Sequence, residues 1–222
     1  MADKAVRIAI VGAESTGKTT LAEALAPRLA ADTGLRVAWV PELLREWCER
    51  MGRTPLMHEQ SGLLQDQGDR IEQAAAANDV VVCDASALMI AVYSRLIFND
   101  RSLEAPAVAL HRGMALTLLT ALDLPWVADR HLRDGPHVRE PVDAVLREVL
   151  NTHRLPWSVV AGSGPARLEN AVDAVAPLLR PLAQTNGGLF TRLAHRNAEQ
   201  VQQAERWRSC DCDDPDCERR LR

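Results

Sequence analysis

The segment from Gly12 to Thr19 reads Gly-Ala-Glu-Ser-Thr-Gly-Lys-Thr, which is a complete Walker A loop. Residues 7–11 before it are apolar and β-branched enough for a buried strand, and the residues after it have helical periodicity. A strand, a glycine-rich loop and a helix in this order are the context in which such a loop cradles the phosphates of a nucleoside triphosphate. The alternative, a glycine turn before an ordinary helix, leaves the fixed positions of the motif unexplained.

The glycines, the lysine and the threonine of this loop have separate roles. Gly12 and Gly17 let the backbone curl so that successive N–H groups point at phosphate oxygens beside a helix N-terminus. We expect Lys18 to reach the β- and γ-phosphates and the Thr19 hydroxyl to bind Mg²⁺. The residues predicted to hold ATP are Gly12, Ala13, Glu14, Ser15, Thr16, Gly17, Lys18, Thr19 and Thr20.

Apolar runs alternate with helical patterns along most of the chain. Strands are predicted at residues 7–11, 37–40, 80–83, 115–120 and 158–161. Helices are predicted at 18–31, 43–51, 59–78, 87–98, 140–153 and 165–179. This alternation is typical of an α/β P-loop NTPase fold, with a parallel five-stranded sheet and helices on both faces. We therefore predict one P-loop domain over 1–182 and a C-terminal extension over 183–222, helical at first and cysteine-bearing at its end.

The overall composition narrows the class of partner. A formal net charge of −4 argues against a nucleic-acid-binding surface, which is normally basic. The first residues carry no apolar signal segment, and no apolar run is long enough to span a bilayer. We expect a cytoplasmic protein whose partners are a nucleotide and a small-molecule acceptor. The oligomeric state is left open, a homo-oligomer included.

The third predicted strand, at residues 80–83, is followed by Asp84, which completes a Walker B pattern. Hydrolytic ATPases commonly follow this aspartate with a glutamate that activates water, but Ala85 and Ser86 follow here, and the guanine-reading Asn-Lys-x-Asp motif is absent. The pattern favours an ATP-dependent kinase with an alcohol as phosphate acceptor. The alternative is a nucleotide-gated regulatory ATPase or switch protein that acts through a partner.

Two carboxylates are expected at the carboxyl ends of strands, where ligands of parallel sheets bind. Glu42 follows residues 37–40 and could accept a substrate hydroxyl proton, although a glutamate there also suits the first turn of the next helix. Asp84 also could have a functional or only a structural role, and we favour binding of Mg²⁺ or of the acceptor hydroxyl.

Arg130 and Arg133 lie one helical turn apart. Their segment could form a lid that neutralises phosphate charge, or it could be the solvated basic face of a surface helix.

Together these residues resemble the ribosylnicotinamide kinase domain of the NadR family, among P-loop kinases with an AAA-type ATPase-like domain. The resemblance rests on residues 12–21, on Pro41-Glu42 with Arg45, on Asp84, and on Pro125-Trp126-Val127-Ala128-Asp129 with Arg133. It implies ATP and Mg²⁺ at Lys18 and Thr19. It also implies an acceptor ribose near Glu42 and Asp84, a substrate pocket bordered by Trp126 and Asp129, and lid arginines at Arg130 or Arg133.

A second resemblance concerns the acceptor. Pro41-Glu42 followed by Arg45-Glu46-Trp47 is also similar to deoxynucleoside kinases, whose base lies at a similar strand end. Both families phosphorylate a 5′-hydroxyl on a ribose-like ring. The two resemblances therefore agree on the reaction and leave the acceptor open between nicotinamide riboside and another nucleoside.

Three cysteines cluster near the end of the sequence, at Cys210, Cys212 and Cys217. Three thiols at this spacing could be ligands of a tetrahedral zinc ion, with a fourth ligand from elsewhere. The alternative is an acidic tail with reduced, exposed thiols. If zinc binds, we expect a structural clip that is separate from phosphate transfer.

Overall fold

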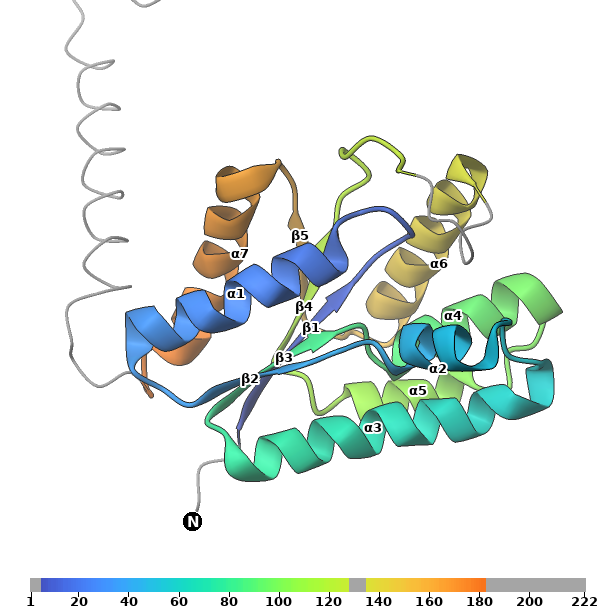
Figure 1. Cartoon of the computed structure of the whole chain (residues 1–222), viewed down its shortest axis with the longest axis horizontal. Helices are drawn as coiled ribbons and strands as arrows, with labels where there is room; N and C mark the ends of the chain where they lie inside the picture. The colour runs from blue at the N-terminus through green and yellow to red at the C-terminus, as the bar shows by residue number, and fades with distance from the viewer. Residues whose placement is uncertain (1–4, 128–134, 183–222) are drawn as a thin grey trace, which may run out of the picture. The chain divides into compact units, whose positions relative to one another are not determined.

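The computed structural model describes residues 5–127 and 135–182, so the predicted extension at 183–222 lies outside the described residues. The described strands are β1 (Val6–Val11), β2 (Val37–Val40), β3 (Val80–Asp84), β4 (Leu116–Thr120) and β5 (Trp157–Val160). They form one parallel sheet of five strands in the order β2-β3-β1-β4-β5 (Figure 1). The predicted α/β P-loop fold is confirmed.

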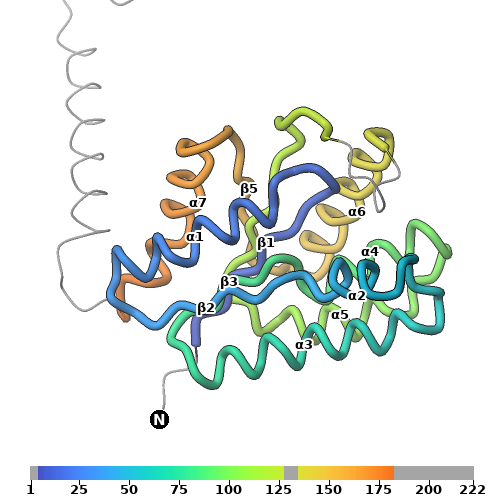
Figure 2. Tube along the Cα trace, viewed as in Figure 1, coloured from blue at the N-terminus to red at the C-terminus, as the bar shows by residue number. Residues whose placement is uncertain are grey.

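Helices cover both faces of this sheet. The α-helices are α1 (Lys18–Thr33), α2 (Leu43–Met51), α3 (Gln60–Ala77), α4 (Ala87–Phe98), α5 (Glu104–His111), α6 (Arg139–Thr152) and α7 (Gly164–Leu179), with short 3₁₀ turns η1 (Met57–Glu59) and η2 (Pro136–Val138). Helices α1 and α7 lie on one face, and α3, α4, α5 and α6 lie on the other (Figures 1 and 2). Within the described ranges, no helix has the length and hydrophobicity that a membrane span requires.

The central strand β1 is buried on both faces, which explains its unbroken apolar sequence. Ala9 and Val11 belong to the cluster that includes the inner faces of α4 and α6, whereas the alternate residues Ile8 and Ile10 are fully buried on the opposite side. Ile10 is in register with Asp84 at the end of β3. This register brings the Walker A loop after β1 and the Asp84 carboxylate to the same edge of the sheet.

Helix α5 is the described α-helix that the sequence pattern did not predict. It has only eight residues, and Pro106 lies inside it. Proline is tolerated in the first turn of a helix because the N–H groups there have no partner within the helix. The helix contributes Ala107, Val108 and His111 to the interior.

His111 connects α5 to the sheet through a fully buried polar network. Its Nδ1 lies 3.0 Å from the Ser86 Oγ, and its Nε2 lies 2.6 Å from the Thr117 Oγ1. Ser86 also caps α4, because its Oγ accepts a hydrogen bond from the Leu88 N–H at 3.3 Å. Burial lowers the pKa of His111 to about 4, so the ring is neutral in the folded protein at neutral pH.

We expect this histidine to make the fold sensitive to acid. Since the pKa of His111 falls from 6.5 to about 4 on folding, the unfolded chain binds the extra proton first. The free energy of unfolding therefore decreases as pH falls from about 6.5 to about 4, by about 3 kcal/mol from this group. Urea titrations across this range should show a flatter pH profile for His111→Gln than for the wild type. Equal slopes would contradict the assignment.

Candidate active site

The Walker A loop connects β1 to α1 and needs glycine at two positions. Gly12 has a φ of 155°, and a Cβ atom there would lie 2.0 Å from the Thr120 Oγ1 at the end of β4. Gly17, which precedes α1, has a φ of 74° in the left-handed region. Any other residue would be strained at these positions, and at Gly12 it would also clash with the sheet. The two glycines of the motif thus adopt backbone conformations that a residue with a side chain could adopt only with strain.

Side-chain hydrogen bonds from the neighbouring strand and loop fix this shape. The Thr16 Oγ1 donates to the Ala13 carbonyl at 2.8 Å and lies 2.7 Å from the Thr120 Oγ1. The Ser15 Oγ accepts a hydrogen bond from the Val127 N–H at 2.8 Å. These contacts hold the Walker A loop in this shape.

A buried arginine from a distant part of the sequence also contacts the loop. Arg167, near the start of α7, donates from Nη2 to the Thr16 carbonyl at 2.8 Å. Its Nη1 donates to the Asp123 carboxylate at 2.8 Å and to the Gly162 carbonyl at 2.7 Å. Only 4% of Arg167 is exposed. This side chain therefore ties together the Walker A loop, the segment after β4 and the turn before α7.

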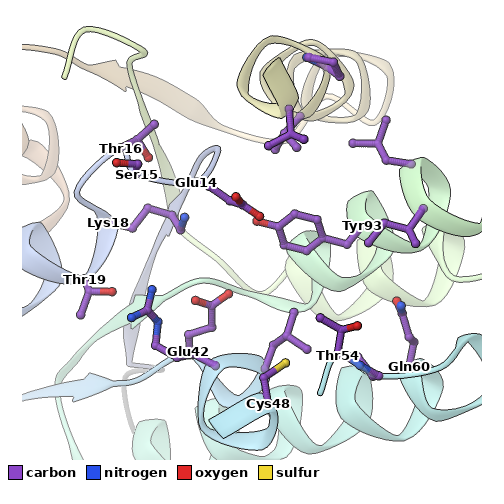
Figure 3. A pocket seen from close by; sticks show the side chains of 18 of the residues that line it. Glu14, Ser15, Thr16, Lys18, Thr19, Glu42, Cys48, Thr54, Gln60 and Tyr93 are labelled. Carbon is purple, nitrogen blue, oxygen red and sulfur yellow. The ribbon is translucent and has the colours of Figure 1, made fainter. Parts of the chain in front are cut away.

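Glu42 lies between the end of β2 and the start of α2, where it occupies the N-cap position. The following residue is fixed from α3, because the Leu43 N–H donates to the Gln67 Oε1 at 2.8 Å. Figure 3 shows the Glu42 carboxylate pointing toward the same space as the Lys18 ammonium. The Lys18 Nζ donates to the Ala13 carbonyl at 3.0 Å, which holds the ammonium along the loop.

Opposing charges surround both predicted carboxylates. Burial raises the pKa of Glu42, the Lys18 and Arg45 cations lower it in part, and the Asp84 carboxylate raises it further. Burial likewise raises the pKa of Asp84, whereas a hydrogen bond with the Thr19 side chain and the charges of Lys18 and Arg45 oppose that rise. The predicted residues Lys18, Glu42, Arg45 and Asp84 thus act on one another electrostatically. Carboxyl groups with pKa values raised in this way, here Glu42 and Asp84, are typical of functional sites.

Thr19 and Asp84 have the chemistry that a magnesium ion requires. Both supply oxygen atoms, and Asp84 is 1% exposed. Its Oδ1 is buried and makes no hydrogen bond with any residue in the described ranges. Mg²⁺ in phosphate-transfer sites is typically held by one or two carboxylates together with substrate phosphates. The two residues therefore fit the predicted metal.

A cavity of about 970 Å³ extends from the Walker A loop past Glu42 to helices α2, α4 and α6 (Figure 3). Its Walker A end is lined by predicted residues from Glu14 to Thr20. Glu42, just before α2, and Arg45, on α2, also line it. Tyr93 enters it from α4, and its side chain and that of Glu14 point toward one another. The space is larger than a phosphate group alone requires, because it continues well beyond Lys18.

Several predicted residues do not join this group. Trp126 is half-buried and does not line the cavity, although its neighbour Val127 contacts the Walker A loop. Asp129, Arg130 and Arg133 lie outside the described residues, as do the cysteines of the predicted zinc clip, Cys210, Cys212 and Cys217. Their roles stay predictions.

The family comparison covers the same part of the chain. A family model described as an AAA domain matches residues 7–167, which include the Walker A loop, Glu42 and Asp84. The chain belongs to this AAA domain family. The Walker A loop of the family implies that the chain binds a nucleotide. No curated protein matches the chain.

Several solved structures, two of them named as kinases, share the fold of this AAA domain. A NadR protein in complex with NR matches with a TM-score of 0.62 and 22% identity, covering 78% of this chain and 50% of that one. A thymidylate kinase from Ehrlichia chaffeensis matches at 0.56 and 14%, covering 79% and 99%. A deoxyadenosine kinase from M. mycoides matches at 0.53 and 13%, covering 78% and 100%. This chain thus spans about half the length of the NadR structure, and identities this low establish the fold alone.

The AAA domain also contains site residues that the sequence reasoning missed. Gln60 and Gln67 are buried on the inner face of α3, in helical spacing with Leu63 and Ile71. Two glutamines at apolar-face positions are a detectable signal, because such positions normally carry hydrophobic residues. Arg167 gave no comparable signal, since its partners are separated from it by up to 151 residues of sequence.

We expect Arg167 to support the Walker A loop of this AAA domain. Arg167→Met should lower the free energy of unfolding by about 2–4 kcal/mol, because it leaves the buried Thr16 carbonyl without its donor and removes the ion pair with Asp123. It should also weaken nucleotide binding, which calorimetric titration with ATP can measure. Arg36→Met is the matched control, since Arg36 is exposed and pairs with Asp79 at the other end of the sheet. Equal effects of both substitutions would contradict the anchoring role.

Proposed function

We propose that this chain is an ATP-dependent kinase that transfers the γ-phosphate to a ribose-type hydroxyl of a nucleoside, with nicotinamide riboside as the first candidate. One observation carries the proposal. Glu42 and Lys18 point into one cavity, which continues from the Walker A loop toward α4 and α6. This arrangement offers phosphate binding, a proton acceptor and room for a second substrate in one cavity.

The transfer requires few protein groups. Glu42 takes the proton of the acceptor hydroxyl as the hydroxyl oxygen bonds to the γ-phosphorus. The bond from the γ-phosphorus to the β–γ bridging oxygen breaks, and ADP leaves with that oxygen. Lys18 offsets the negative charge on the phosphates during this exchange. Arg130 and Arg133 are proposed to act from the lid.

Thr19 and Asp84 are the residues that would hold Mg²⁺. When bound, the ion supplies positive charge that neutralises phosphate oxygens. The raised pKa of Glu42 suits its proposed role, because a base with a pKa nearer to neutrality accepts a proton more readily. The Lys18 cation, and to a lesser extent the Arg45 cation, oppose that rise in the pKa.

The structural neighbours support a nucleoside acceptor. They include a NadR protein in complex with NR, a thymidylate kinase and a deoxyadenosine kinase. Thymidylate is already a nucleotide, so of these names NR and deoxyadenosine are the ones that agree with a free ribose-type hydroxyl as the acceptor. The fold alone does not choose among acceptors, so the choice is left to experiment.

Steady-state assays with a panel of ribonucleosides and deoxyribonucleosides test this proposal. ATP consumption should depend on the acceptor, and mass spectrometry should detect a nucleoside monophosphate in amounts equal to the ADP formed. Acceptor-independent hydrolysis without a phosphorylated product would instead favour the nucleotide-gated regulatory ATPase. Assays with non-nucleoside alcohols in the same format separate a kinase of another acceptor class from both.

A further inference from the structure

The part of the cavity wall that α2, α4, η2 and α6 form is largely apolar. It includes the aliphatic and aromatic side chains of Leu44, Leu96, Phe98, Val138 and Val142. Such a surface suits a flat heterocycle, which gains by leaving water, better than a phosphate or a free sugar. A polar group in this wall would fix the orientation of that heterocycle.

Gln60, at the first position of α3, is such a group. Only 3% of the residue is exposed, yet it lines the cavity. Figure 3 shows its amide beside Thr54, at the opposite end of the cavity from Lys18. The Gln60 Oε1 is buried and accepts no hydrogen bond from the described part of the chain.

The second buried glutamine of α3 shows that this helix can satisfy a buried amide oxygen. The Gln67 Oε1 accepts the Leu43 N–H and so supports the fold. The Gln60 oxygen has no such role, and an unpaired buried acceptor lowers stability. Native proteins rarely retain such a group without a functional reason. Its place in the cavity wall provides that reason.

We infer that Gln60 determines which ring the acceptor carries. Its Oε1 accepts a hydrogen bond from an N–H of a primary carboxamide or an exocyclic amine on the heterocycle. The inference rests on the proposed function for the identity of the acceptor as a nucleoside. A site built to pair with an N–H rejects the analogue without one, because the buried oxygen then stays desolvated and unpaired.

Binding of matched nucleosides tests this inference without the chemical step. Calorimetric titrations of the full chain with a non-hydrolysable ATP analogue would compare adenosine with inosine, cytidine with uridine, and nicotinamide riboside with nicotinic acid riboside. The wild type should bind the N–H-bearing member of at least one pair about 10-fold or more tightly. Gln60→Leu should reduce that preference to less than about 3-fold.

Matched variants make the result specific. Gln65→Leu changes an exposed glutamine of the same helix and should keep the wild-type preference. Gln60→Met provides a second, near-isosteric variant, so that a folding defect in Gln60→Leu does not block the test. The inference is overturned by an unchanged preference in a folded Gln60 variant, by a wild-type preference for the carbonyl-bearing members, or by no binding of any nucleoside. Selective binding without phosphate transfer would instead contradict only the proposed function.

Discussion

Lys18→Ala should reduce phosphate transfer by at least about 100–1,000-fold. The substitution removes the cation that Figure 3 places in the cavity beside Glu42, so charge that develops on the phosphates loses its compensation. It also removes one of the charges that lower the pKa of Glu42 and Asp84, so both carboxyl groups would hold their protons more firmly. Initial rates at saturating ATP and acceptor measure the loss.

The matched control for this variant is Arg36→Ala. Arg36 is an exposed cation whose Nη2 lies 2.7 Å from the Asp79 Oδ1, away from the cavity lining. Exposed ion pairs contribute little to stability, so activity and melting temperature should stay near the wild-type values. A Lys18→Ala protein with wild-type transfer rates would refute the assignment of the Walker A loop to phosphate binding.

The sheet and the Walker A end of the site could be predicted because their signals are local. Residues 7–11 read as a strand, and the loop and helix follow at once, so the order of elements fixes where Lys18 lies. Asp84 could be assigned in the same way, since it directly ends an apolar strand. Parallel pairing then brings both to one edge, as the register of Ile10 with Asp84 shows.

The rest of the site depends on contacts that sequence order does not reveal. Tyr93 lies on a helix whose apolar residues all read as core, and its sequence position does not reveal that its side chain lines the cavity. Arg167 meets the Walker A loop through the fold alone. Helix α5 was missed for a local reason, because eight residues with an internal proline carry too weak a helical signal.

Glu42→Gln should lower turnover by about 100–10,000-fold while ATP affinity stays close to the wild-type value. The substitution keeps the size and the N-cap position of the side chain but removes its ability to accept a proton. Because Glu42 lies at the end of β2 and not in the Walker A loop, it should have little direct effect on nucleotide binding. Single-turnover rates and calorimetric ATP titrations separate the two quantities.

Glu46→Gln tests whether this effect is specific to the cavity. Glu46 lies on the same helix, one turn further on, but it is exposed and its Oε2 lies 2.7 Å from the Arg70 Nη1. Its substitution should leave turnover unchanged, since it removes only a surface ion pair. Equal turnover in Glu42→Gln and the wild type would transfer the base role to Asp84 or leave catalysis to positioning.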